Sequence, residues 1–341
     1  MKAAESKAET KADVPESGGP SAVLLLVHGN NAGPDDWLDA ANYVKAAAGN
    51  GLRVIRAASN AHDTHGGVDF CGRRLADELI RALVPICAAS GAPSAAPAAV
   101  RGPSFLYNCT AAVLAEGPAV LVPVPAAPLD FYIVAHSLGG LVSRWCIGHL
   151  ATCGFLQAGV LRPRVFMSLA SPHLGVRAPG WQVWRSWINL ASILGRTESQ
   201  LVFHDAAGEG EQPLLAVMAD PAGDAMLGLS LFERRVAVGV ANYDILVPAA
   251  SACICAGTAL RVVPTGTWSM ARDVDSADAF QLRPAQNTAG ERLTKYCWPR
   301  NEKTGWVESS SRALNIPTQV LDGLQALSWE RRLVSAPPTL L

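Results

Sequence analysis

The sequence predicts an α/β fold, a doubly wound and mostly parallel sheet with helices on both faces. Continuous apolar runs, typical of strands buried on both faces, alternate with segments of helical periodicity. Polar residues gather where the apolar runs end, which is where open α/β sheets place their sites. The 341 residues, 50% hydrophobic and 17% charged, suffice for one large domain or two smaller ones.

The predicted elements follow one another in regular alternation. We expect strands at 22–27, 53–57, 131–136, 165–170 and 234–240, and helices at 35–48, 68–86, 138–151 and 318–327. Residues 1–20 lack periodicity and are interpreted as a disordered tail, followed by one domain over 21–335. Within this domain, 88–128 is Ala/Pro-rich and is interpreted as an insertion, and 176–232 as a lid- or cap-like helical region.

Composition excludes several classes of function. The net charge of −1 gives no basic field for nucleic acid. No phosphate-binding glycine motif, dinucleotide fingerprint or metal-ligand spacing is present, so we expect neither a cofactor nor a metal. The N-terminal segment has no apolar core, which argues against a secretory signal. We therefore expect a cytoplasmic protein whose eight cysteines are reduced.

The stretch Ile133–Arg144 has the pattern of a nucleophile elbow. An apolar strand ends at Ser137, and a helix begins directly after it. Small residues, Ala135 and Gly139, stand two positions on either side, as the tight strand-to-helix turn of an α/β-hydrolase requires. Alanine at the first flank departs mildly from the usual glycine. The sequence therefore predicts the α/β-hydrolase fold with Ser137 as the nucleophile, in preference to a serine that only caps the helix.

Ester hydrolysis also needs oxyanion donors and a group that orients the base. The backbone N–H of Leu138, and that of Asn30 in the loop after the first strand, are the natural donors. Asp244 follows the strand at 234–240, where the acid of a Ser-Asp-His order belongs. From position alone, Asp244 is equally well explained as a turn residue.

Further motifs make the chain similar to a known family. The matching segments occur in the family's order, at 26–29, 67–69, 72–76, 135–141, 168–175, 194–197, 213–215 and 241–248. On these motifs the chain resembles a serine esterase family of lipase-like α/β-hydrolases, whose relatives include yeast and plant glycerolipid lipases. The resemblance implies Ser137 as nucleophile and Asp244 as the triad acid. It also implies an active-site-adjacent loop at 171–175.

One part of the pattern is missing, because no histidine follows Asp244 in this sequence. Three explanations are open. The chain can be a truncated or alternatively spliced form, which we rank first, or a non-catalytic relative that still binds acyl chains. Alternatively a histidine from elsewhere replaces the base, with His173 the candidate substitute and His62 a second. Loss of the triad histidine leaves only the residual catalysis of the oxyanion hole and binding.

A tryptophan-rich segment suggests the substrate. Trp181, Trp184 and Trp187 share one face of a predicted helix, which suits an acyl pocket or a lid at a lipid surface, although packing on the core explains it equally well. We expect a serine carboxylic ester hydrolase acting on acyl esters, with glycerolipids as substrates. It would work at a membrane or lipid-droplet surface. The alternative is a pseudo-hydrolase that binds lipid or a partner.

Overall fold

The structure of the chain is a computed structural model. It describes residues 19–89, 98–100, 120–122, 124–176, 195–206, 208, 210–240, 247, 249–254, 300–301, 306–307 and 316–334. The predicted tail, most of the predicted insertion and the tryptophan-rich segment lie outside these residues.

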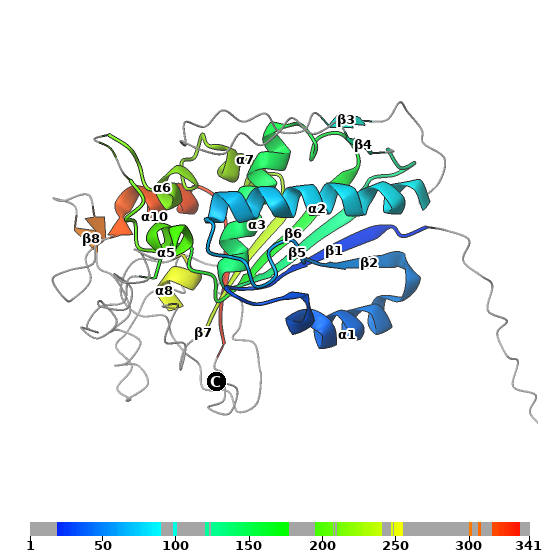
Figure 1. Ribbon diagram of the computed structural model, residues 1–341, viewed down its shortest axis with the longest axis horizontal. Coiled ribbons are helices and arrows are strands. Elements are labelled where there is room, and N and C mark those ends of the chain that lie inside the picture. Colours follow the sequence, from blue (N-terminus) through cyan, green and yellow to red (C-terminus); the bar gives the residue numbers. More distant parts are fainter. Residues whose placement is uncertain are drawn as a thin grey trace, which may run out of the picture.

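A six-stranded parallel sheet forms the centre of the molecule (Figure 1). Its strands, in spatial order, are β11 (Glu330–Val334), β7 (Arg234–Val240), β6 (Leu161–Leu169), β5 (Leu129–His136), β1 (Ala22–Val27) and β2 (Leu52–Arg56). The chain passes from β1 to β2 on one side and then returns to β5 on the other side of β1. The loops after β1 and β5 therefore diverge at the point where ligands bind in open parallel sheets.

Alternate residues of each strand face opposite layers. Val23 and Leu25 of β1 join the larger core beneath α2 (Val68–Ala89), α3 (Leu138–Thr152) and α7 (Asp224–Ser230). Leu24 and Leu26 pack on the other face, against α1 (Leu38–Ala48). Figure 1 shows α1 and α2 on opposite sides of the sheet. This layering, with the sheet order, confirms the predicted α/β-hydrolase fold.

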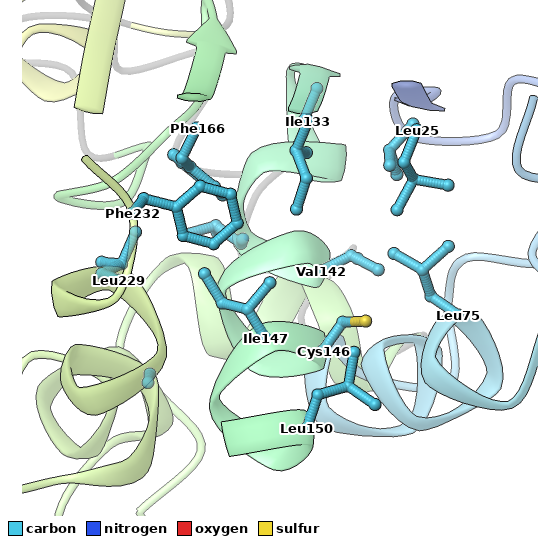
Figure 2. Packing of buried hydrophobic residues seen from close by; sticks show 14 of the residues in the cluster. Leu25, Leu75, Ile133, Val142, Cys146, Ile147, Leu150, Phe166, Leu229 and Phe232 are labelled. Atoms are coloured by element: carbon cyan, nitrogen blue, oxygen red, sulfur yellow. The ribbon is translucent and has the colours of Figure 1, made fainter. Parts of the chain in front are cut away.

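The larger core fixes α3 against the sheet. Figure 2 shows side chains of the strands pointing towards Val142 and Cys146 of this helix. Phe232, just after α7, packs against both Phe131 and Phe166, with ring centroids 5.9 and 6.0 Å apart. Because α3 begins at the predicted elbow, this packing holds the elbow rigidly on the sheet.

The remaining elements are short. They comprise α5 (Arg196–Leu201), α6 (Leu214–Val217), α8 (Ala249–Ala252), α10 (Thr318–Gln325), the 3-10 helices η1 (Pro34–Trp37) and η2 (Gly49–Gly51), and two small antiparallel sheets. The small sheets are formed by β3 (Ala98–Val100) with β4 (Val120–Val122), and by β8 (Arg300–Asn301), β9 (Trp306–Val307) and β10 (Ile316–Pro317). Among the described helices, none is long and apolar enough to cross a membrane.

Candidate active site

Ser137 lies at the junction of β5 and α3 in a strained backbone conformation. Its φ of 52° and ψ of −127° fall in a region that residues with a side chain rarely adopt. Its N–H donates to the carbonyl of Leu169 at 2.8 Å, and its carbonyl accepts from Gly140 N–H at 3.1 Å. Such a turn lifts the side chain of Ser137 out of the strand and above the sheet edge.

The two glycines after Ser137 allow close backbone contacts. A Cβ on Gly139 would lie 2.5 Å from the carbonyl oxygen of His28 and 2.8 Å from that of Val27. A Cβ on Gly140 would collide with the hydroxyl of Ser171. The glycine pair therefore lets α3 begin directly against the end of β1 on one side and the loop after β6 on the other.

The loop after β1 reaches the nucleophile candidate. A Cβ on Gly29 would lie only 3.0 Å from the Cβ of Ser137. Within the described part of the chain, neither Asn30 N–H nor Leu138 N–H donates a hydrogen bond. Two free backbone donors beside a serine hydroxyl are what an oxyanion hole requires. The assignment of Asn30 and Leu138 as the oxyanion donors stays a prediction.

The hydroxyl of Ser137 is partly exposed, and among the described residues it has no hydrogen-bond partner. Asp244 and the three candidate substrate-binding residues, Trp181, Trp184 and Trp187, lie outside the described residues. β7 ends at Val240, at the same edge of the sheet as Ser137 and four residues before Asp244 in sequence. The roles assigned to these four residues stay predictions.

His173, the candidate substitute base, is held elsewhere. Its Nε2 is 2.8 Å from the hydroxyl of Ser168, and its ring packs on Trp329 with centroids 5.6 Å apart. The side chain is fully buried, and burial together with the Arg144 guanidinium holds the pKa of His173 well below its usual range. These contacts describe a neutral core histidine and give no support to a role on Ser137.

Two of the family-like motifs meet in three dimensions. Asp69, at the start of α2, accepts hydrogen bonds from Arg196 Nη2 at 2.9 Å and Gln200 Nε2 at 3.1 Å, both from α5. The α5 side chains also satisfy the first N–H groups of α2, because Gly67 N–H donates to Thr197 and Val68 N–H to Gln200. Helix α5 therefore locks the loop before α2 in place.

This loop in turn contacts the predicted oxyanion loop. Thr64 Oγ1 accepts from the N–H of Asn31 at 2.9 Å and donates to Oδ1 of Asn30 at 2.5 Å. In the same loop His65 Nδ1 lies 2.6 Å from Glu198 of α5. Thr64 and His65 were not predicted from the sequence, since single polar residues in a loop carry no spacing that reveals such partners.

The last strand, β11, ends level with the end of β7. β11 runs parallel to β7, with Val334 opposite Val240, so the chain leaves both strands at the edge that carries Ser137. The residues that follow β11 in the sequence, 335–341, include no histidine. Among the described residues no group of three or more His, Cys, Asp or Glu side chains is arranged to hold a metal ion.

The chain matches a family of serine esterases over its central part. Residues 130–257 match the family model described as "Putative serine esterase (DUF676)". The protein named "Putative lipase C4A8.10" from Schizosaccharomyces pombe is 36% identical over 123 residues. That alignment covers 34% of this chain and only 15% of the yeast protein. The predicted resemblance to lipase-like serine esterases is confirmed over this segment, which contains both Ser137 and Asp244.

Solved structures with some similarity include a Bacillus licheniformis lipase, BlEst2. Its propeptide form is 15% identical and its mature form 16%, each with a TM-score of 0.35. Both alignments cover 68% of this chain, and they cover 38% and 69% of the respective lipase chains. Similarity at this level adds nothing to the fold, which the order and direction of the strands define by themselves.

Proposed function

We propose that this chain is a serine carboxylic ester hydrolase of the lipase or esterase type. The proposal is carried by one observation: Ser137 stands on a strained elbow next to the loop after β1, and among the described residues the N–H groups of Leu138 and Asn30 have no hydrogen-bond partner. This combination suits acyl transfer, in which a hydroxyl attacks a carbonyl and the developing negative charge needs donors that are already in place.

In the proposed reaction, Ser137 Oγ attacks the acyl carbonyl carbon and loses its proton to a base. The N–H groups of Leu138 and Asn30 stabilise the tetrahedral oxyanion. Collapse breaks the bond to the alcohol, which takes up the proton, and leaves the acyl group on Ser137. Water then attacks the acyl-enzyme, releasing the carboxylic acid and restoring the hydroxyl.

The substrates we propose are acyl esters of lipids, with glycerolipids foremost. Support comes from the lipase-like relatives and from the tryptophan-rich face predicted for residues 181–194. Such a face suits a protein that works at a membrane or lipid-droplet surface from the cytoplasm. Asp244 is the proposed acid of the site.

A second function, binding lipid or a partner without turnover, is favoured by a specific observation. Residues 245–341 include no histidine, and among the described residues no histidine nitrogen is bonded to Ser137 Oγ. Without a base the hydroxyl keeps its proton, so acylation would be slower by several orders of magnitude. The oxyanion hole and the acyl pocket would still bind an ester.

A fluorophosphonate probe separates the two functions. If Ser137 is an activated nucleophile, the probe labels the full chain and Ser137→Ala abolishes labelling. Ser143→Ala is the matched control, because Ser143 lies on the same helix and is fully buried with no partner for its hydroxyl among the described residues. This control should keep wild-type labelling and wild-type hydrolysis of p-nitrophenyl esters.

The result that would reject the enzyme is a folded wild-type chain that neither reacts with the probe nor hydrolyses short or long acyl esters. Binding of a labelled fatty-acyl ester by that inert chain would establish the second function. Labelling that persists in Ser137→Ala would reject Ser137 as the nucleophile whichever substrate is used.

A further inference from the structure

Thr64 occupies an unusual position between two loops of the candidate site. Its side chain is 2% exposed, although it lies in a loop. The single hydroxyl makes two hydrogen bonds to the loop after β1: it accepts from Asn31 N–H and donates to Asn30 Oδ1. A hydroxyl has one proton and can accept in addition, so both capacities serve the same loop.

The residue held by Thr64 needs such support. Asn31 has a φ of 50°, in the left-handed region, where the backbone is not held by regular secondary structure. His62 N–H, from the same loop as Thr64, donates to the carbonyl of Ala32 at 2.9 Å. The loop after β1 is therefore fixed by its contacts to residues 62–64.

Thr64 is itself anchored from the opposite side. Its carbonyl accepts the hydroxyl proton of Thr197 at 2.5 Å, and the same hydroxyl accepts Gly67 N–H at 2.9 Å. Thr197 is fully buried at the first turn of α5. Two threonine hydroxyls thus link α5, the loop before α2 and the loop after β1 into one chain of hydrogen bonds.

We propose that Thr64 is a positioning residue that sets the backbone of the oxyanion loop, with Thr197 as its anchor. This inference rests on the proposed function, because it assigns Thr64 a role through the Asn30 N–H. An oxyanion donor acts only when it lies about 2.7–3.1 Å from the developing charge. Thr64 holds the Asn30 side chain and the Asn31 N–H on the far side of this residue, and a rotation of the Gly29–Asn30 peptide, which carries the Asn30 N–H, would move that N–H out of range while leaving Ser137 on its elbow.

The test compares Thr64→Val, which replaces the hydroxyl by a methyl group of similar size, with Thr64→Ser, which keeps the hydroxyl. We expect Thr64→Val to lower kcat on a p-nitrophenyl ester about 10- to 100-fold with KM nearly unchanged, less than the loss of a whole oxyanion donor. Thr64→Ser should recover most of kcat. Thr152→Val is the control, because among the described residues the Thr152 hydroxyl bonds only to the Gly148 carbonyl within α3.

A second measurement does not depend on turnover. Amide hydrogen exchange of Asn31 should accelerate at least about 10-fold in Thr64→Val and stay near wild type in Thr64→Ser, because the N–H loses its acceptor only in the first variant. The double variant Thr64→Val, Thr197→Val should show less than the product of the two single effects on kcat, since both act through one loop.

The results of these measurements distinguish a failure of the inference about Thr64 from a failure of the proposed function. Unchanged Asn31 exchange in Thr64→Val overturns the inference. So does an equal loss of kcat in the Val and Ser variants, which would indicate packing. If the wild-type chain has no reactivity, the proposed function fails. The exchange measurement then decides alone whether Thr64 fixes the loop.

Discussion

Arg144 carries a positive charge in the interior of the protein, one helical turn after Gly140. Its side chain is fully buried, and its Nη2 donates to the carbonyl of Met218 at 2.7 Å. Its Nε and Nη1 have no partner within the described residues, and burial lowers the pKa of Arg144 to about 9. An unpaired buried cation is costly, because the lost hydration is not replaced.

We expect Arg144→Met to raise the free energy of unfolding. Methionine fills a similar length without charge, and replacing buried charged groups by apolar ones of similar volume often stabilises by about 1–4 kcal/mol. Arg144→Ala should destabilise instead, because it leaves a cavity. Denaturant unfolding at pH 7 measures both, and a loss of stability in Arg144→Met would show that Arg144 is paired in solution.

Among individual residues, the sequence predicts those that belong to a short motif with fixed spacing. Ser137 and Gly139 follow from the elbow, whose spacing is set by the turn itself. The role of Thr64 cannot be predicted in this way, since its partner Asn31 is 33 residues away and no motif in the sequence links the two. His173 was considered because it follows a strand; only its contact with Ser168 shows what it bonds to.

The crossing of α3 and α7 depends on two glycines that face one another. A Cβ on Gly148 would lie 2.7 Å from the Cα of Ala225, and one on Gly228 would lie 2.6 Å from the N of Gly148. The two backbones are therefore in direct contact. Because backbone atoms cannot rotate aside, any side chain here must separate the helices.

We expect Gly148→Ala to destabilise the protein by about 1–3 kcal/mol, despite the better helix propensity of alanine, because overpacking outweighs propensity. Gly51→Ala is the matched control, since among the described residues beyond its chain neighbours its Cβ would meet only Ser21 Oγ, at 3.7 Å. Thermal unfolding should show a clear loss of Tm for the first variant and almost none for the second. Equal Tm values for both would contradict the close contact.

The sequence predicts most elements of the sheet but not all of them. Strand β1 was predicted to the residue and β5 to within two residues at its start, because long apolar runs mark the central strands of a parallel sheet. β11 was missed, since Glu330, Arg331 and Arg332 give it the composition of a loop. These charges are tolerated because β11 is an edge strand, where Glu330 pairs with Arg234 of β7 through two hydrogen bonds at 2.6 and 2.8 Å.

For the whole molecule, the parallel sheet brings the separate pieces of the site to one edge. The loop after β1, the elbow after β5 and the end of β7 come from residues far apart in sequence. The fold class, and hence this convergence, follows from the alternation of strands and helices. The hydrogen bonds that hold the loops cannot be predicted from the sequence, because they depend on side-chain geometry rather than on the hydrophobic periodicity of strands and helices.

Buried neutral histidines link the stability of the whole fold to pH. His149, 7% exposed on α3, has its pKa lowered to about 4, first by burial and then by Arg73 of α2. Asp224 of α7 opposes this shift, and Asp220 lines the same small cavity of about 140 Å³. In the unfolded chain a histidine titrates near 6.5, so between pH 6.5 and 4 the unfolded state binds more protons than the native state.

The contribution of His149 to stability must therefore fall as the pH is lowered through this window, by about 3 kcal/mol between pH 7 and 4. His173 adds a loss of the same sign, since its pKa is also lowered. The raised carboxyl pKa values of Asp77 and Asp205 act in the opposite direction, so the wild-type curve alone does not isolate His149.

The contribution of His149 is isolated by comparing the pH dependence of stability in wild type and in a His149 variant. In denaturant unfolding at a series of pH values, His149→Gln should lose about 3 kcal/mol less than wild type between pH 7 and 4, whatever its stability at pH 7. Parallel curves for wild type and His149→Gln would mean that the native state admits the proton, and that α3 and α7 are less closed around His149 than their packing indicates.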